Sequence, residues 1–346
     1  MKKIILSLLT LFTLVFSAKA QELETILLAK EDASKLTNAY LNPAMKGFIY
    51  SMNNGWYHTA KVHKKFGFDI TIGANISFIP SKDEIFNIAK LNLSSNTTVT
   101  NGVNSSPTVA GSEDITPADL RYETTVNGQQ VTADFTMPNG VKEDLPANAV
   151  PAPSIQVGLG LPFKLEAMVR YVPEVGSDDV KGSLFGIGLK KEITSWFGPL
   201  DKLPLHVSLL AGYTNMNVDY TIGDVDGEIE VRDGITQFKL NSYTVQAIAS
   251  INFPIINFYG GVGYNGGNTK LDVKGDSFVA NYESSTIPSV VVREDLGRNP
   301  LSLKSTASGF NATIGTRLSL GFFKIFGSYT MQEYNSVSAG IAFSFR

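Results

Sequence analysis

The side chains most able to do chemistry in this sequence are its three histidines, His58, His63 and His206. His58 and His63 lie five residues apart beside Trp56, a spacing that matches no standard zinc pair. His206 could titrate within a pore, but a hydrogen-bonded structural histidine is the favoured interpretation. We therefore expect no metal site and no cofactor.

A hydrolase or acyltransferase would need a nucleophile, a base and an orienting carboxylate within reach of one another. Ser208 and His206 have the same parity on one predicted strand, with Asp69 or Glu166 as conceivable third members. Nothing distinguishes this group from the other serines on the same face. We expect no enzyme, and loss of lipase or acyl-transfer activity in a His206→Ala variant would overturn that expectation.

A glycine-rich stretch, residues 261–266, formally matches the dinucleotide-binding fingerprint. That chemistry needs glycines that open a helix, whereas this stretch lies inside a predicted strand that continues to Val273. Glycines that let a strand curve or pack closely explain the stretch better.

Charged side chains recur on the lumen-facing side of the predicted strands, which His206 shares, at Lys164, Glu166, Arg170, Arg317 and Lys324. They could form a charged constriction or an anchor for the carboxylate of an amphiphile. The alternative, which we favour, is a ladder of internal salt bridges that fills a narrow barrel. A second, acidic set could contact a divalent cation or lipopolysaccharide, although solvated loop charge is the favoured interpretation. Its members are Glu113, Asp114, Asp119, Glu143 and Asp144.

The first twenty residues have the pattern of a cleaved secretory signal peptide: Lys2 and Lys3, an apolar run, then small residues up to Ala20. We expect the mature chain to start at Gln21. An exported chain with no cysteine excludes a disulfide scaffold. A net charge of -3 gives no electrostatic case for nucleic-acid binding. Charged residues make up 18% of the chain, below the roughly 25% usual in soluble domains, which suits a surface that partly faces lipid.

Alternation of apolar with small or polar residues predicts about ten strands. They span residues 66–79, 154–161, 163–172, 183–193, 204–220, 236–252, 255–273, 307–319, 321–332 and 337–345. The longest connections all fall at odd positions in the order, and most even ones are tight turns, as in outer-membrane barrels with both termini in the periplasm. Residues 119–137 look like a further hairpin, which we place above the membrane. The expected fold is therefore all-β, a transmembrane antiparallel up-and-down β-barrel of about 10–14 strands.

Residues 21–65 differ in character and predict a short helical plug before the barrel of residues 66–346. Residues 23–29 and 32–40 read as short helical pieces, the second ending before Asn42-Pro43, because proline disfavours helix in the residue before it. A long outer loop is expected at residues 80–153.

This plug carries Asp32-Ala33-Ser34 and Asn42-Pro43-Ala44, followed by an aromatic, glycine-rich stretch that includes Trp56 and His58. In these features the chain resembles the FadL-like long-chain fatty-acid outer-membrane transporter superfamily, closest to an uncharacterised branch of unknown function. The resemblance implies a barrel, typically of fourteen strands, that takes hydrophobic compounds through a lateral opening in its wall. It also implies that the N-terminal segment acts as a hatch.

The sequence thus favours an outer-membrane barrel for uptake or passage of small hydrophobic or amphiphilic molecules. The competing class is a non-transporting surface barrel whose outer loops, residues 80–153 and 274–306, bind a partner. Expected partners are outer-membrane lipid or lipopolysaccharide, a hydrophobic cargo, and the barrel-assembly machinery, through a last strand ending in Phe343-Ser344-Phe345.

Overall fold

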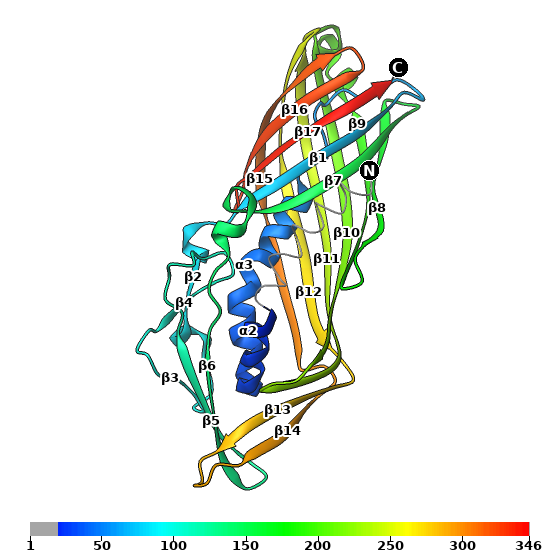
Figure 1. Cartoon of the computed structure of the whole chain (residues 1–346). Helices are drawn as coiled ribbons and strands as arrows, with labels where there is room; N and C mark the ends of the chain where they lie inside the picture. The colour runs from blue at the N-terminus through cyan, green and yellow to red at the C-terminus, as the bar shows by residue number, and fades with distance from the viewer. Residues whose placement is uncertain (1–19, 346) are drawn as a thin grey trace.

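Ten antiparallel strands close into a barrel in the computed structural model, which describes residues 20–345 (Figure 1). Around the ring they follow the order β10-β9-β8-β7-β1-β17-β16-β15-β12-β11, and pairing of β10 with β11 closes it. The barrel strands are β1 (Phe68–Phe78), β7 (Ala149–Leu161), β8 (Leu165–Gly176), β9 (Val180–Glu192), β10 (Leu205–Val225), β11 (Ile229–Asn252), β12 (Ile256–Lys274), β15 (Leu301–Leu320), β16 (Phe323–Met331) and β17 (Ser336–Phe345). The predicted all-β barrel is confirmed, with one strand for each segment predicted.

The two longest connections of the barrel lie at the same end. Residues 162–164, 253–255 and 321–322 form tight turns at one end, together with the helical connection η6 (Thr194–Lys202). We call this the short-turn end, and the opposite one, which carries residues 79–148 and 275–300, the long-loop end. The long-loop end also has three tight turns, residues 177–179, 226–228 and 332–335, two of which are shorter than predicted because their strands are longer. Strands β10 and β11 run five and seven residues further toward the long-loop end than predicted. The added residues lack the apolar outward-facing side chains whose alternation with polar ones predicted the strands.

The outer face of the barrel is apolar between two aromatic bands. At one level, cross-strand pairs join Tyr213 to Tyr243 and Tyr264 to Phe310. Near the short-turn end, Phe68 and Phe345 stack with their ring centroids 5.1 Å apart. Along β15 the apolar outer face runs from Phe310 to about Leu320, which spans roughly 25 Å at a tilt of about 40°. This is the surface of a barrel that spans a membrane.

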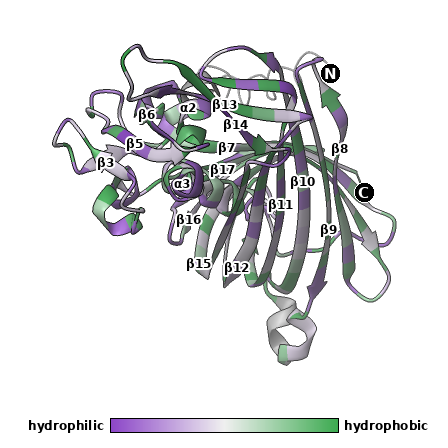
Figure 2. Ribbon diagram, turned by 90° about the horizontal axis from the view of Figure 1, so that it is seen from below, coloured by the Kyte–Doolittle hydropathy of each residue, from purple (hydrophilic) through white to green (hydrophobic). Residues whose placement is uncertain are grey.

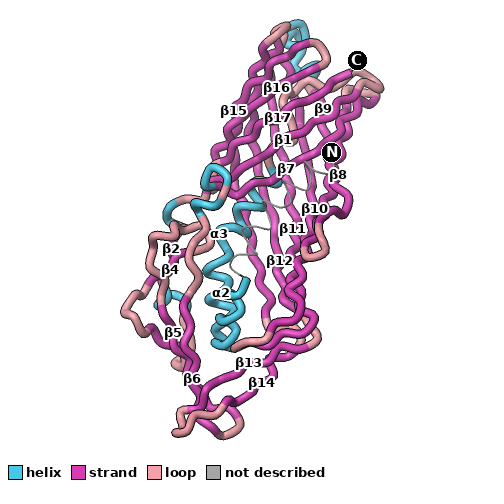
Figure 3. The backbone as a smooth tube through the Cα atoms, viewed as in Figure 1, coloured by secondary structure: helices cyan, strands magenta, loops and turns pink. Residues whose placement is uncertain are grey.

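Three helical elements precede the barrel: α2 (Ala20–Thr25), η1 (Ile26–Asp32) and α3 (Ala33–Asn53). They lie at the long-loop end, beside the parts of β10, β11, β12 and β15 that continue beyond the aromatic band of Tyr213, Tyr243, Tyr264 and Phe310 (Figure 3). We call these four the extended strands. The prediction that the helix stops before Pro43 is wrong, because α3 continues through it to Asn53. Fifteen of its 21 residues are buried, and this packing outweighs the one hydrogen bond that proline removes. No helix in the described part of the chain is long and apolar enough to cross a membrane.

The two long loops build a second wall around these helices. The first loop contains β2 (Ile85–Asn87), β3 (Thr97–Val99), β4 (Ser105–Pro107), β5 (Asp119–Val126) and β6 (Gln129–Thr136), with short helical turns η2 (Ser81–Asp83), η3 (Ile88–Leu91), η4 (Lys142–Asp144) and η5 (Pro146–Asn148). The second contains β13 (Ser277–Ser284) and β14 (Val291–Gly297). The sheet continues from β11 through β13 and β6 to β5 and β3, so that α2 and α3 lie between this wall and the extended strands (Figure 2). The hairpin predicted at residues 119–137 is thus β5 with β6, outside the barrel.

The predicted signal peptide, residues 1–20, lies almost entirely outside the described residues.

Candidate functional site

Residues 54–67 form an extended segment inside the barrel, which we call the lumen segment. It links the end of α3 to β1, whose first residue is at the short-turn end. Its backbone is held by side chains of the inner wall: Gln156 donates to the Trp56 carbonyl over 3.1 Å, and the amide of Ala60 donates to Ser250 Oγ over 3.1 Å. The lumen at the level of the membrane is therefore occupied by the protein's own chain.

Trp56 of the lumen segment packs against Arg170 of β8, and each side chain is 1% exposed. The guanidinium lies 3.8 Å from the indole ring centroid and donates to the carbonyls of Met52 and Asn54 over 2.9 and 2.8 Å. The indole also packs against the wall, where a Cβ added to Gly212 would lie 2.7 Å from Trp56 Cε2. The barrel register thus leaves space for this indole by placing glycine there.

Nearer the short-turn end, two charged side chains of the wall hold His58 of the lumen segment. Arg317 Nη1 lies 3.0 Å from His58 Nδ1, and His58 Nε2 lies 3.2 Å from Asp69 Oδ2. Because arginine can only donate, His58 Nδ1 accepts and its Nε2 carries the proton toward the carboxylate. This chain of three groups joins β15, the lumen segment and β1.

His63 belongs to a second polar group, centred on Glu166. The carboxylate accepts from His63 Nδ1 over 2.9 Å and from the His63 amide over 3.0 Å, while Lys190 Nζ lies 2.8 Å away. Glu166 and Lys190 are 3% and 2% exposed, so this is a buried ion pair that orders the plug rather than a solvated constriction.

The remaining predicted residues lie toward the short-turn end. His206 Nδ1 contacts Glu192 Oε1 over 2.9 Å, whereas Ser208 Oγ donates to the Ala60 carbonyl over 2.5 Å, so the structure does not assemble the hydrolase trio. The prediction that Lys164 lies on the strand is wrong: it sits exposed in the β7–β8 turn with a φ of 57°. Lys324 is half-buried and donates to the Gly321 carbonyl. No group of three or more metal-ligating side chains occurs within residues 20–345.

Asp32 and Asn42, from the two short motifs of the plug, bind the first long loop and β15. Asp32 is buried and accepts from the Ser94 amide over 2.9 Å and from Thr97 Oγ1 over 2.7 Å, which ties the start of α3 to the first long loop. Burial opposes the charge on Asp32, but these hydrogen bonds and Lys35 outweigh it and hold the pKa of the carboxyl below its usual range. Asn42 Oδ1 accepts from Ser305 Oγ on β15 over 2.5 Å.

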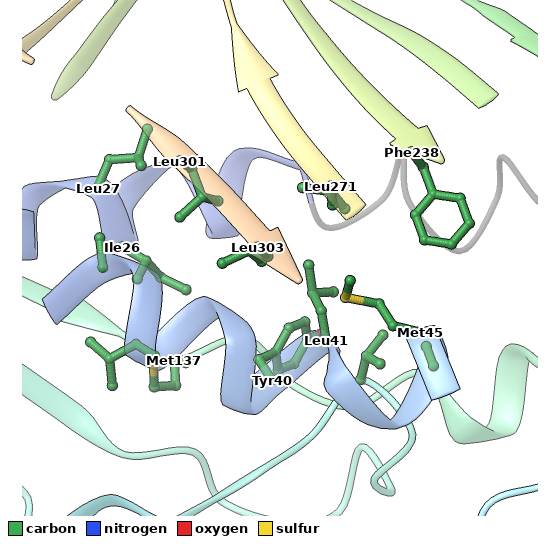
Figure 4. Packing of buried hydrophobic residues seen from close by; sticks show 14 of the residues in the cluster. Ile26, Leu27, Tyr40, Leu41, Met45, Met137, Phe238, Leu271, Leu301 and Leu303 are labelled. Carbon is green, nitrogen blue, oxygen red and sulfur yellow. The ribbon is translucent and has the colours of Figure 1, made fainter. Parts of the chain in front are cut away.

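An apolar pocket lies between the helices and the inner face of the extended strands. It comprises about 890 Å³ of space free of protein atoms, including the solvent at its mouth. Eleven of its fifteen lining residues are aliphatic or phenylalanine. Leu27 and Leu41 come from the helices, and Phe238, Leu271 and Leu301 come from β11, β12 and β15 (Figure 4). A concavity with a mostly apolar lining and a few polar groups is typical of a small-molecule site.

The barrel wall parts beside this pocket. β7 and β8 pair only from Gln156–Arg170 down to Leu161–Leu165. Above this point, residues 149–155 pair with β1 alone and residues 171–176 with β9 alone among the described strands, and β7 turns away from β8 (Figure 1). Pro151, Pro153 and Pro173 lie along this seam, and proline cannot donate to a sheet ladder. Val180, next to the seam on β9, lines the pocket.

Sequence reasoning found Glu166, Arg170 and Arg317 but missed their partners in the plug. The sequence places Trp56 in the plug but does not reveal its contact with the wall at Gly212. The glycines of the inner face were a usable signal, because a glycine on the buried face of a strand indicates that something large packs there. The pocket left no local signal, since its lining comes from nine separate elements.

Fold and site together define a membrane-spanning β-barrel with an occupied lumen and an apolar chamber at one end. A model of a family of unknown function, DUF6588, matches residues 1–345, and the chain belongs to that family. No curated protein matches the chain.

Solved structures similar to the chain include bacterial surface proteins. Ail, the attachment invasion locus protein of Yersinia pestis, has 8% identity and a TM-score of 0.26, over 81% of this chain and 99% of its own. The transport unit of the autotransporter AIDA-I from Escherichia coli has 11% identity and a TM-score of 0.29, over 92% and 99%. The translocator domain of NalP from Neisseria meningitidis has 9% identity and a TM-score of 0.24, over 82% and 90%. The fold described above rests on the strand pairing.

Proposed function

We propose that this protein is an outer-membrane barrel, exported through its signal peptide, that takes up a small hydrophobic or amphiphilic molecule from outside the cell. The pocket between α3 and the extended strands receives the molecule, and the β7–β8 seam is its route toward the membrane. The observation that carries the proposal is the apolar lining of that pocket, to which Leu41, Phe238 and Leu271 contribute.

The orientation follows from the loops. Barrels of the outer membrane place short turns in the periplasm and long loops outside. The pocket lies beyond the aromatic band marked by Tyr213 and Tyr243, since Val218 and Phe238 follow it on the long-loop side. The pocket is therefore offered to the exterior rather than to lipid.

Binding can be tested with n-decanol, an uncharged amphiphile, by calorimetry on the barrel in phosphatidylcholine nanodiscs, with empty nanodiscs subtracted. Ile222→Trp places an indole in the pocket and is expected to weaken binding at least tenfold. Thr221→Trp, the neighbouring exposed position, is the matched control and should bind as the unmodified protein does. Binding no greater than that of empty nanodiscs, or equal binding by the two variants, contradicts the proposal.

The second candidate is a surface barrel that does not transport. It is favoured by the buried Glu166–Lys190 pair and by Arg170, which hold the lumen segment in place. Uptake of a pyrene-labelled decanol by cells discriminates between the two. Transport predicts faster uptake with the Thr221→Trp protein than with Ile222→Trp, whereas equal rates with both support the surface barrel.

A further inference from the structure

The pocket contains one carboxylic side chain, Glu24 on α2. The other polar lining residues are Thr37, Tyr220 and Thr236, and no lysine, arginine or histidine lines it. Among the described residues of the lining, a fatty-acid carboxylate would meet another carboxylate and no cation. The lining is thus unsuited to the anionic head that a fatty-acid carrier must accommodate.

Two polar groups in the pocket could bind the head of a ligand. Glu24 is half-buried, and burial raises the pKa of its carboxyl above the usual range. Thr37 is 2% exposed, and its Oγ1 has no hydrogen-bond partner in the described part of the chain. A buried hydroxyl without a partner is costly, and a ligand that donates to it or accepts from it would remove that cost.

We propose that the pocket selects amphiphiles with a cationic, hydrogen-bond-donating head, that is, hydrophobic amines, and discriminates against fatty-acid carboxylates. Glu24 acts as the counter-ion of the ammonium, and Thr37 Oγ1 accepts a hydrogen bond. The apolar tail packs among the leucine, valine and phenylalanine side chains of the extended strands. The inference rests on the proposed function and specifies its ligand class.

Three ten-carbon ligands test it: n-decylamine, n-decanol and n-decanoate, titrated at pH 7.5 into the full barrel. Zwitterionic phosphatidylcholine nanodiscs keep the bilayer from favouring either charge, and empty nanodiscs correct for partition. Decylamine is expected to bind at least tenfold more tightly than decanoate, with decanol between them. Glu24→Gln should bring the amine and the carboxylate to within about threefold of each other. Thr37→Val should weaken decylamine and decanol severalfold.

Glu31→Gln is the matched control, because Glu31 is exposed and does not line the pocket, and it should keep the preference for the amine. Decanoate binding as tightly as decylamine, or a preference that persists in Glu24→Gln, overturns the inference while decanol binding leaves the proposed function intact. If none of the three ligands binds beyond the empty nanodiscs, the proposed function and the inference fall together.

Discussion

Replacing Arg170 with alanine should release the lumen segment while leaving the barrel closed. Arg170 contacts no lipid, and its partners are the Trp56 ring, the carbonyls of Met52 and Asn54, and Gln156. Two buried carbonyls that lose their donor cost about 1–3 kcal/mol each. Loss of a desolvated cation–π contact costs about 2 kcal/mol more. Even at the lower end, about 4 kcal/mol, the equilibrium between bound and released segment moves roughly a thousandfold.

The absence of cysteine makes this release measurable. A cysteine at Ala60, which is 0% exposed, should react with a maleimide only when the segment leaves the wall. Its labelling rate should rise a hundredfold or more on Arg170→Ala. Lys61→Cys, at an exposed position, should react quickly in both backgrounds. If Ala60→Cys stays unreactive in Arg170→Ala while gel mobility shows a folded barrel, the Arg170 anchor does not hold the segment and the reasoning is refuted.

Three further outcomes are expected. Gly212→Val should destabilise the barrel by about 1–3 kcal/mol in thermal unfolding, since its Cβ would meet Trp56 at 2.7 Å; equal cost in a Trp56→Ala background would contradict the contact. Because the pKa of Asp32 is lowered in the folded protein, its contribution to stability is present above the ordinary value of 3.8 and is lost as pH falls below it. Proteolysis of the first long loop should therefore accelerate on acidification in the unmodified protein, and Asp32→Asn should remove that dependence. Val262→Arg, inside the apolar band, should cost about 2–4 kcal/mol in urea unfolding from bilayers, and Thr221→Arg, beyond it, almost nothing; equal costs would place the band wrongly.

The barrel could be predicted because lipid imposes one rule on every strand that crosses it. The face that includes Ile70 and Ile72 must be apolar, and the alternation is visible without knowledge of the partner strand. Beyond the aromatic bands the strands no longer face lipid, and their outward side chains need not be apolar. The ends of β10 and β11 were therefore missed, and the strand limits there depend on packing against α2 and α3.

The site was less predictable because its contacts join distant parts of the chain. Arg170 and Trp56 are 114 residues apart, and only the register of the closed barrel brings them together. Pro43 misled for a related reason: a local rule against helix was overridden by burial against strands far along the chain. Lys164 was misplaced because its turn uses a positive φ that a strand pattern does not reveal.

The closing pair of strands constrains the order of assembly. β1 and β17 pair from Phe68–Phe345 to Ser77–Ser336, so the ring is completed only after nearly the whole chain is present. The helices, however, lie at the opposite end from the first residue of β1, with the lumen segment between them. We therefore expect the wall to close around a chain that already occupies its centre. The N-terminal segment is then a template that the folding sheet wraps, and its loss should slow barrel formation as well as empty the barrel.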